Sequence, residues 1–217
     1  MRISTDPDRN QSSGEELSNT ISHGAALVAA LVGTPFIISN AVRSEDAWSV
    51  VGASIFSATI ILLYLASALY HLLPAGKAKR IFRVIEHSAI FLLIAGTYTP
   101  FTLGVLRGVW GWTLFGIIWG IALIGVTLKV FVKGSHPVLS TILYLSMGWV
   151  IVIAIKPLLA GMPMEGFLWL LAGGLSYTAG VYFYVTDWRF HYGHFIWHLF
   201  VITGTVCHYF AVFRYAV

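Results

Sequence analysis

The sequence predicts an all-α integral membrane protein, built as a seven-transmembrane helix bundle. Of its 217 residues, 58% are hydrophobic and only 10% are charged, which is more apolar than a soluble domain of this size requires. The apolar residues form runs of about 20 residues, which favour membrane-spanning helices over the short alternating strands of a barrel. The polar connections between the runs are short, so we expect one transmembrane domain.

The expected elements follow directly from these runs. We expect residues 1–14 to form a mobile cytoplasmic tail, because they are polar and lack the apolar centre of a signal peptide. We expect residues 15–217 to form the single seven-helix domain. The spans are expected near residues 20–42, 48–73, 82–104, 110–131, 137–157, 165–185 and 194–214.

The distribution of lysine and arginine predicts the orientation. With seven spans, the N-terminal tail shares one side of the membrane with the second, fourth and sixth loops. That side carries nine of the thirteen basic residues, and the opposite side carries four. The positive-inside rule therefore predicts a cytoplasmic N-terminus and an external C-terminus. The net charge of +4 is explained by this pattern, so we expect no nucleic-acid partner.

The last span carries the most informative motif. His194 and His198 are four residues apart, so on a helix they lie about 40° apart and one turn from each other. They can therefore bind one metal ion, and ionisable residues inside a membrane usually mark a functional site. His208 lies roughly 15 Å further along the same helix and cannot share that ion.

The predicted topology brings further polar residues to the same end of the bundle. The second span finishes there with Ser67 and His71, and the third span begins there with Glu86. The first span begins there with Glu16, Asn19 and His23 at helical spacing.

The metal interpretation is a zinc site made by His71, His194 and His198. Three imidazoles with a water as the fourth ligand are typical of catalytic zinc, whereas magnesium and calcium prefer several carboxylates. Zinc acidifies a bound water, Glu86 could accept its proton, and Ser67 could donate to an oxyanion or to the water. Alternatively, each histidine is a hydrogen-bonded packing residue, and Ser67 bonds back to its own helix.

Four segments together resemble the progestin and adipoQ receptor family, in its bacterial hemolysin III branch: Glu16–His23, Ser67–His71, Glu86–Pro100 and His194–His198. The resemblance implies a seven-helix bundle in the bacterial cytoplasmic (inner) membrane, with zinc bound by His71, His194 and His198. It implies that Ser67 contacts the metal or one of its ligands. The wider superfamily includes alkaline ceramidases and usually has aspartate where this sequence has Glu86. Glu86 could therefore bind zinc directly or act through water.

Three functions are compatible with this pattern. The first is a zinc-dependent hydrolase acting on an amide or ester bond of a membrane lipid, with Glu86 and Ser67 as catalytic residues and Glu16, Asn19 and His23 supporting the metal ligands. The second is a zinc-stabilised sensor or regulator of membrane state, for which lipid is a ligand. The third is a pore, which the sequence disfavours because it shows neither an amphipathic pore-lining helix nor a ring of like charges. The sequence predicts no oligomeric state.

Overall fold

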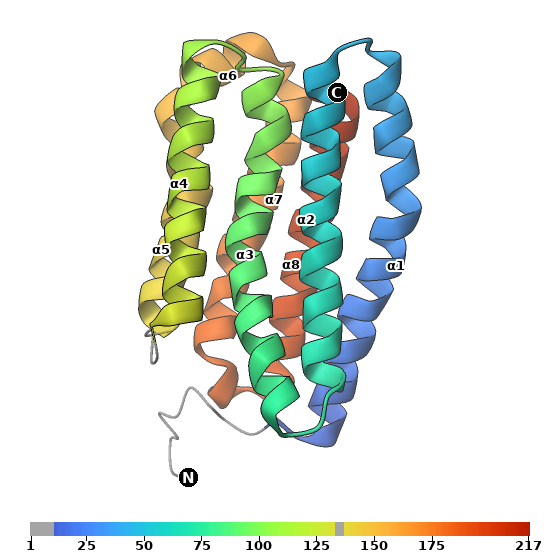
Figure 1. The fold of residues 1–217 in the computed structure, drawn as a ribbon, viewed down its shortest axis with the longest axis vertical. Helices are drawn as coiled ribbons and strands as arrows, with labels where there is room; N and C mark the ends of the chain where they lie inside the picture. The colour runs from blue at the N-terminus through green and yellow to red at the C-terminus, as the bar shows by residue number, and fades with distance from the viewer. Residues whose placement is uncertain (1–10, 133–136) are drawn as a thin grey trace.

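The computed structural model describes residues 11–132 and 137–217, and within them the chain is helical throughout, with no strand (Figure 1). Seven described helical segments are long and apolar enough to cross a membrane, which confirms the predicted fold class. The elements are α1 (Ser13–Arg43), α2 (Ala47–Leu72), α3 (Lys77–Leu103), α4 (Val109–Phe131), α5 (Pro137–Trp149), η1 (Val150–Ala154), α6 (Ile155–Gly161), α7 (Met164–Val185), η2 (Asp187–Arg189) and α8 (Gly193–Tyr215).

The first helix begins earlier than its apolar run. Its N-terminus is fixed by a capping box, in which Ser12 accepts a hydrogen bond from the Glu15 backbone and the Glu15 carboxylate accepts one from the Ser12 backbone. This cap extends α1 by two turns of polar sequence before residue 20, where we expected the span to start. Of the expected tail, residues 1–10 lie outside the described residues, and Ser13 and Gly14 already belong to α1.

The fifth span is one membrane crossing built from three pieces. The 3-10 turn η1 interrupts the α-helix between α5 and α6, and the whole crossing covers Val138–Gly161. An interrupted helix leaves backbone groups that must find partners inside a membrane. The Tyr98 hydroxyl supplies them: it lies 2.9 Å from the Met147 carbonyl oxygen, to which it donates, and it accepts from the Ile151 N–H at 2.9 Å.

The spans pack side by side in chain order, and α8 closes the bundle against α1 (Figure 1). The most buried spans are α2, α3 and α8. Close approach of α2 and α3 depends on Gly96, because a Cβ there would lie 2.0 Å from the Thr59 hydroxyl oxygen. The start of α1, the end of α2, the start of α3 and the start of α8 all meet at one end of the bundle (Figure 1).

Candidate metal centre

Three histidines from two helices converge at this end of the bundle. His71 lies on the last turn of α2, and His194 and His198 lie one turn apart at the start of α8. One ligand nitrogen from each lies within 4.8 Å of the others, which makes this a group that could hold one metal ion. His198 is completely buried and His71 is 4% exposed. The convergence of these three side chains is therefore as the sequence predicts.

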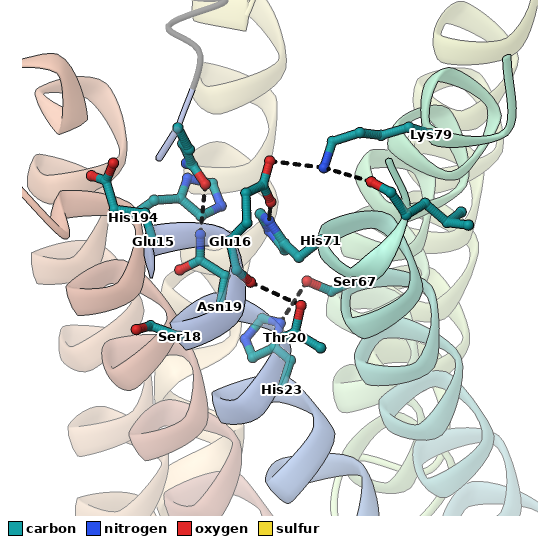
Figure 2. Close-up of polar contacts among 12 residues, drawn as sticks. Glu15, Glu16, Ser18, Asn19, Thr20, His23, Ser67, His71, Lys79 and His194 are labelled. Carbon is teal, nitrogen blue, oxygen red and sulfur yellow. Dashed lines mark hydrogen bonds and ion pairs between the residues drawn. The ribbon is translucent and has the colours of Figure 1, made fainter. Parts of the chain in front are cut away.

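The His71 ring is oriented by a carboxylate from α1. Its Nδ1 lies 2.7 Å from Glu16 Oε2, so Nδ1 carries the proton and donates to the carboxylate (Figure 2). Glu16 is held in turn by Lys79, whose ammonium donates to Glu16 Oε1 at 2.8 Å and to the Leu73 carbonyl at 3.2 Å. The Nε2 lone pair of His71 is left available, and this buried atom has no hydrogen-bond partner among the described residues.

The Ser22 hydroxyl, on α1, orients the His198 ring so that Nδ1 carries the proton, as it does in His71. Ser22 Oγ lies 3.1 Å from His198 Nδ1 and donates its own proton to the Asn19 carbonyl at 3.0 Å. Because the hydroxyl proton is already used, the Ser22 oxygen accepts from the His198 Nδ1–H. His198 Nε2 is therefore an unprotonated nitrogen, and it too is buried without a hydrogen-bond partner in the described part of the chain.

The third histidine has an acidic neighbour at longer range. His194 Nδ1 lies 3.9 Å from Asp187 Oδ2, in the connection between α7 and α8. Histidines that bind metals generally donate their second ring N–H to a carboxylate, carbonyl or water, which fixes the tautomer and the ring orientation. Glu16 meets this requirement directly, and Ser22 meets it with a hydroxyl.

A second hydrogen-bonded network, besides the one around His71, lies beside the cluster and joins α1, α2 and α3. Ser67 Oγ donates to Glu86 Oε1 at 2.6 Å and lies 2.7 Å from His23 Nδ1. Since the single Ser67 proton is directed to the Glu86 carboxylate, His23 Nδ1–H is the donor to Ser67. Glu86 Oε1 lies 3.7 Å from His71 Nε2, so the carboxylate borders the metal-binding nitrogens. All three side chains of this network, those of His23, Ser67 and Glu86, are buried.

The structure distinguishes the roles of the three α1 residues that the sequence grouped together. Glu16 contacts His71 directly, as described above. His23 is 1% exposed and its ring stacks on His198 with centroids 3.5 Å apart, so it is a core residue of the site rather than an interfacial one. The Asn19 side chain donates to Gln11 at 2.7 Å, and only its backbone carbonyl acts toward the cluster, through Ser22.

Sequence reasoning missed two residues of the site. Ser22 precedes His23 by one position and follows Glu16 by six, so it lies about 100–120° around α1 from the face that Glu16 and His23 share. Lys79 was counted only among the charges that set orientation, yet its ammonium holds Glu16 and lies 4.9 Å from the centre of the Tyr70 ring. His208 lies apart from the cluster, with its Nε2 3.2 Å from the Leu170 carbonyl.

The donor set fits a zinc ion better than a hard cation. Three neutral imidazole nitrogens suit zinc, whereas magnesium and calcium require several oxygen ligands. Two of the three nitrogens are buried atoms without a hydrogen-bond partner in the described residues, and an unpartnered buried polar atom is costly unless something binds it. The metal identity stays a prediction.

The fold and the site define a class of protein: a polytopic membrane protein with a buried three-histidine cluster at one end of a seven-helix bundle. The chain belongs to the haemolysin-III related family, whose model matches residues 11–209.

Relatives along almost the whole chain support this assignment. The chain is 43% identical over 206 residues to a Hemolysin-3 homolog of Bacillus subtilis (strain 168), covering 94% of this chain and 95% of the relative. It is 41% identical over 201 residues to Hemolysin-3 of Bacillus cereus, covering 93% and 91%. It is 29% identical over 214 residues to human monocyte to macrophage differentiation factor, covering 93% and 84%. The resemblance identified from the sequence motifs is thereby confirmed.

Proposed function

We propose that this protein is a zinc-dependent hydrolase that cleaves an amide or ester bond of a membrane lipid and acts in membrane homeostasis. The observation that carries the proposal is the position of Glu86, whose Oε1 lies 3.7 Å from His71 Nε2 and accepts the Ser67 proton. A carboxylate beside three convergent imidazoles supplies a base next to the metal position.

Zinc, when bound by His71, His194 and His198, would polarise the lipid carbonyl and acidify water. Glu86 accepts the proton of the attacking water and returns it to the leaving amine or alkoxide. Ser67 fixes the direction of that carboxylate, because its hydroxyl donates to Oε1. In this arrangement Ser67 acts through Glu86, and it must rotate before it can donate to an oxyanion.

The experiment compares metal content with turnover. We expect about one zinc per chain, and loss of zinc and thermal stability in His194→Ala/His198→Ala, since metal bound to the folded state adds to folding free energy. Glu86→Gln should keep zinc and lower turnover of a lipid amide or ester by about 100-fold or more. Full zinc occupancy in the double variant would refute the site.

A second candidate function rests on the same 3.7 Å distance between Glu86 Oε1 and His71 Nε2. If Glu86 binds the metal as a fourth protein ligand, the site is closed and zinc is structural, as in a sensor or regulator of membrane state. Glu86→Asp distinguishes the two: the hydrolase should keep its turnover, whereas a four-ligand site should bind zinc more weakly with the shorter side chain. Absence of zinc-dependent fatty-acid release from every lipid class tested would favour the regulator.

We further propose that the protein lies in the bacterial cytoplasmic membrane with its N-terminus in the cytoplasm. Nine basic residues against four support this orientation. A reporter fused after Val217 should then report the external side, and labels placed in residues 77–80 should report the cytoplasm. If both report the same side, the orientation is wrong.

A further inference from the structure

A groove lies between the start of α3 and the end of α4, at the same end of the bundle as the histidine cluster. Its volume is about 390 Å³. The lining residues are Lys77, Arg80, Ile81, Val84, Ile85 and Val130. The groove is separate from the metal centre, because Glu86 is buried and lies about 180° around α3 from Lys77 and about 160° from Val84.

The lining side chains change from charged to apolar along the helix. Positions 77, 80, 81, 84 and 85 form one face of α3, over roughly 12 Å of helix length. The two cations occupy the first turn, at the end of the span. Ile81, Ile85 and, from α4, Val130 follow and are 37–53% exposed, so they offer an apolar wall at membrane depth.

The two cations at the mouth of the groove are not neutralised by the fold. Glu16 is engaged by Lys79, on a different face of α3. Neither the Lys77 ammonium nor the Arg80 guanidinium pairs with a carboxylate in the part of the chain that the structure describes, and both side chains are exposed. Lys129, on the last turn of α4, is a further basic residue at this end of the two helices.

We infer that this groove binds an anionic phospholipid, with its phosphate at Lys77 and Arg80 and an acyl chain along Ile81, Val84 and Ile85. Cations at the membrane surface beside an apolar wall match the charge of an acidic phospholipid headgroup and the apolar character of its acyl chain, and basic pockets between transmembrane helices take acidic headgroups. An inorganic phosphate would satisfy the two cations and leave the apolar wall unused. The site depends on neither the metal nor the proposed hydrolysis.

The test measures binding of phosphatidylglycerol against phosphatidylcholine with identical acyl chains. Native mass spectrometry of the purified protein should show preferential retention of phosphatidylglycerol, and phosphatidylglycerol nanodiscs should raise the unfolding temperature above that in phosphatidylcholine. Lys77→Gln/Arg80→Gln should weaken phosphatidylglycerol binding by about 30-fold. Each basic residue near an anionic surface raises the affinity about five- to sixfold, and the variant removes two of them. Arg43→Gln/Arg214→Gln removes the same charge at the opposite end and should keep the preference.

A second variant separates a seated lipid from diffuse electrostatic attraction. Val84→Trp fills the groove and retains both cations, so it should abolish the preference while leaving the unfolding temperature in phosphatidylcholine close to that of the wild type. The inference is overturned if Val84→Trp or Lys77→Gln/Arg80→Gln retains phosphatidylglycerol like the wild type. It is equally overturned if inorganic phosphate at the same concentration gives the same stabilisation.

Discussion

The carboxylate of Glu16 is expected to control metal affinity without touching the metal. Its Oε2 accepts the His71 Nδ1–H at 2.7 Å, and this bond holds Nε2 toward the cluster. Replacing Glu16 with alanine leaves the His71 ring free to rotate and removes the negative charge beside it. Loss of such a partner typically lowers metal affinity by 10- to 100-fold, or about 1.4–2.7 kcal/mol.

Two further variants of this contact give graded effects. Glu16→Gln can keep a hydrogen bond to His71 but loses the charge and the ion pair with Lys79. We therefore expect its metal affinity to lie between those of the wild type and Glu16→Ala. Lys79→Met leaves the Glu16–His71 bond in place, and its effect on metal affinity should be smaller than that of Glu16→Gln. Glu165→Gln, at the first turn of α7, is the matched control and should not change the affinity.

The assay is zinc competition against a chelator of known affinity, read together with the difference in unfolding temperature between the metal-loaded and metal-free protein. Both should fall in the order wild type, Lys79→Met, Glu16→Gln, Glu16→Ala, because metal bound only to the folded state stabilises it according to its affinity. Wild-type affinity in Glu16→Ala would refute the role of this carboxylate. An equal loss in Glu165→Gln would show that the effect is not local.

Three other predictions follow from single contacts. His23→Asn keeps an N–H near the position of Nδ1 and should preserve the hydrogen bond to Ser67. His23→Gln should instead lose about 1–3 kcal/mol of unfolding free energy in the metal-free protein. Equal losses of unfolding free energy in the two variants would contradict this assignment. Tyr98→Phe leaves the Ile151 N–H without its partner and should lower the unfolding temperature with unchanged zinc content. The hydrogen bond from Arg107 lowers the pKa of Asp46, so this contact adds stability above about pH 4 that is lost as the pH falls through the lowered folded-state pKa. The stability difference between the wild type and Asp46→Asn, measured by thermal unfolding from pH 6 to pH 3, should shrink toward acid pH; a constant difference would contradict the assignment.

Much of the fold was predictable because it depends on local composition. A run of about 20 apolar residues must form a helix in a membrane, since every backbone group has to be satisfied within the segment. The span count therefore follows from hydropathy alone. The interruption at η1 does not, because it depends on a hydroxyl contributed by Tyr98, about fifty residues earlier in the chain.

The ligand histidines were predictable for a related reason. His194 and His198 are related by helical spacing, and topology places the end of α2 beside the start of α8. The orientation of each ring was not predictable, because it depends on contacts between helices far apart in the sequence. Ser22 and His198 are 176 positions apart, and the stacking of His23 on His198 depends on how closely α1 packs against α8.

Both polar networks around the cluster include side chains of α1, which is the least buried of the helices that meet at the site. Glu16 and Ser22 on this helix orient the rings of His71 and His198, and His23 directs the Ser67 proton to Glu86. The capping box that extends α1 to Ser13 places Glu16 within the first turns of that helix, at the level of the His71 ring. Glu15 then joins the two helix starts, because its Oε1 accepts the Tyr192 N–H at 3.0 Å, immediately before α8. The polar start of α1, which precedes the apolar run expected from residue 20, is therefore part of the structure that holds the candidate metal ligands in place.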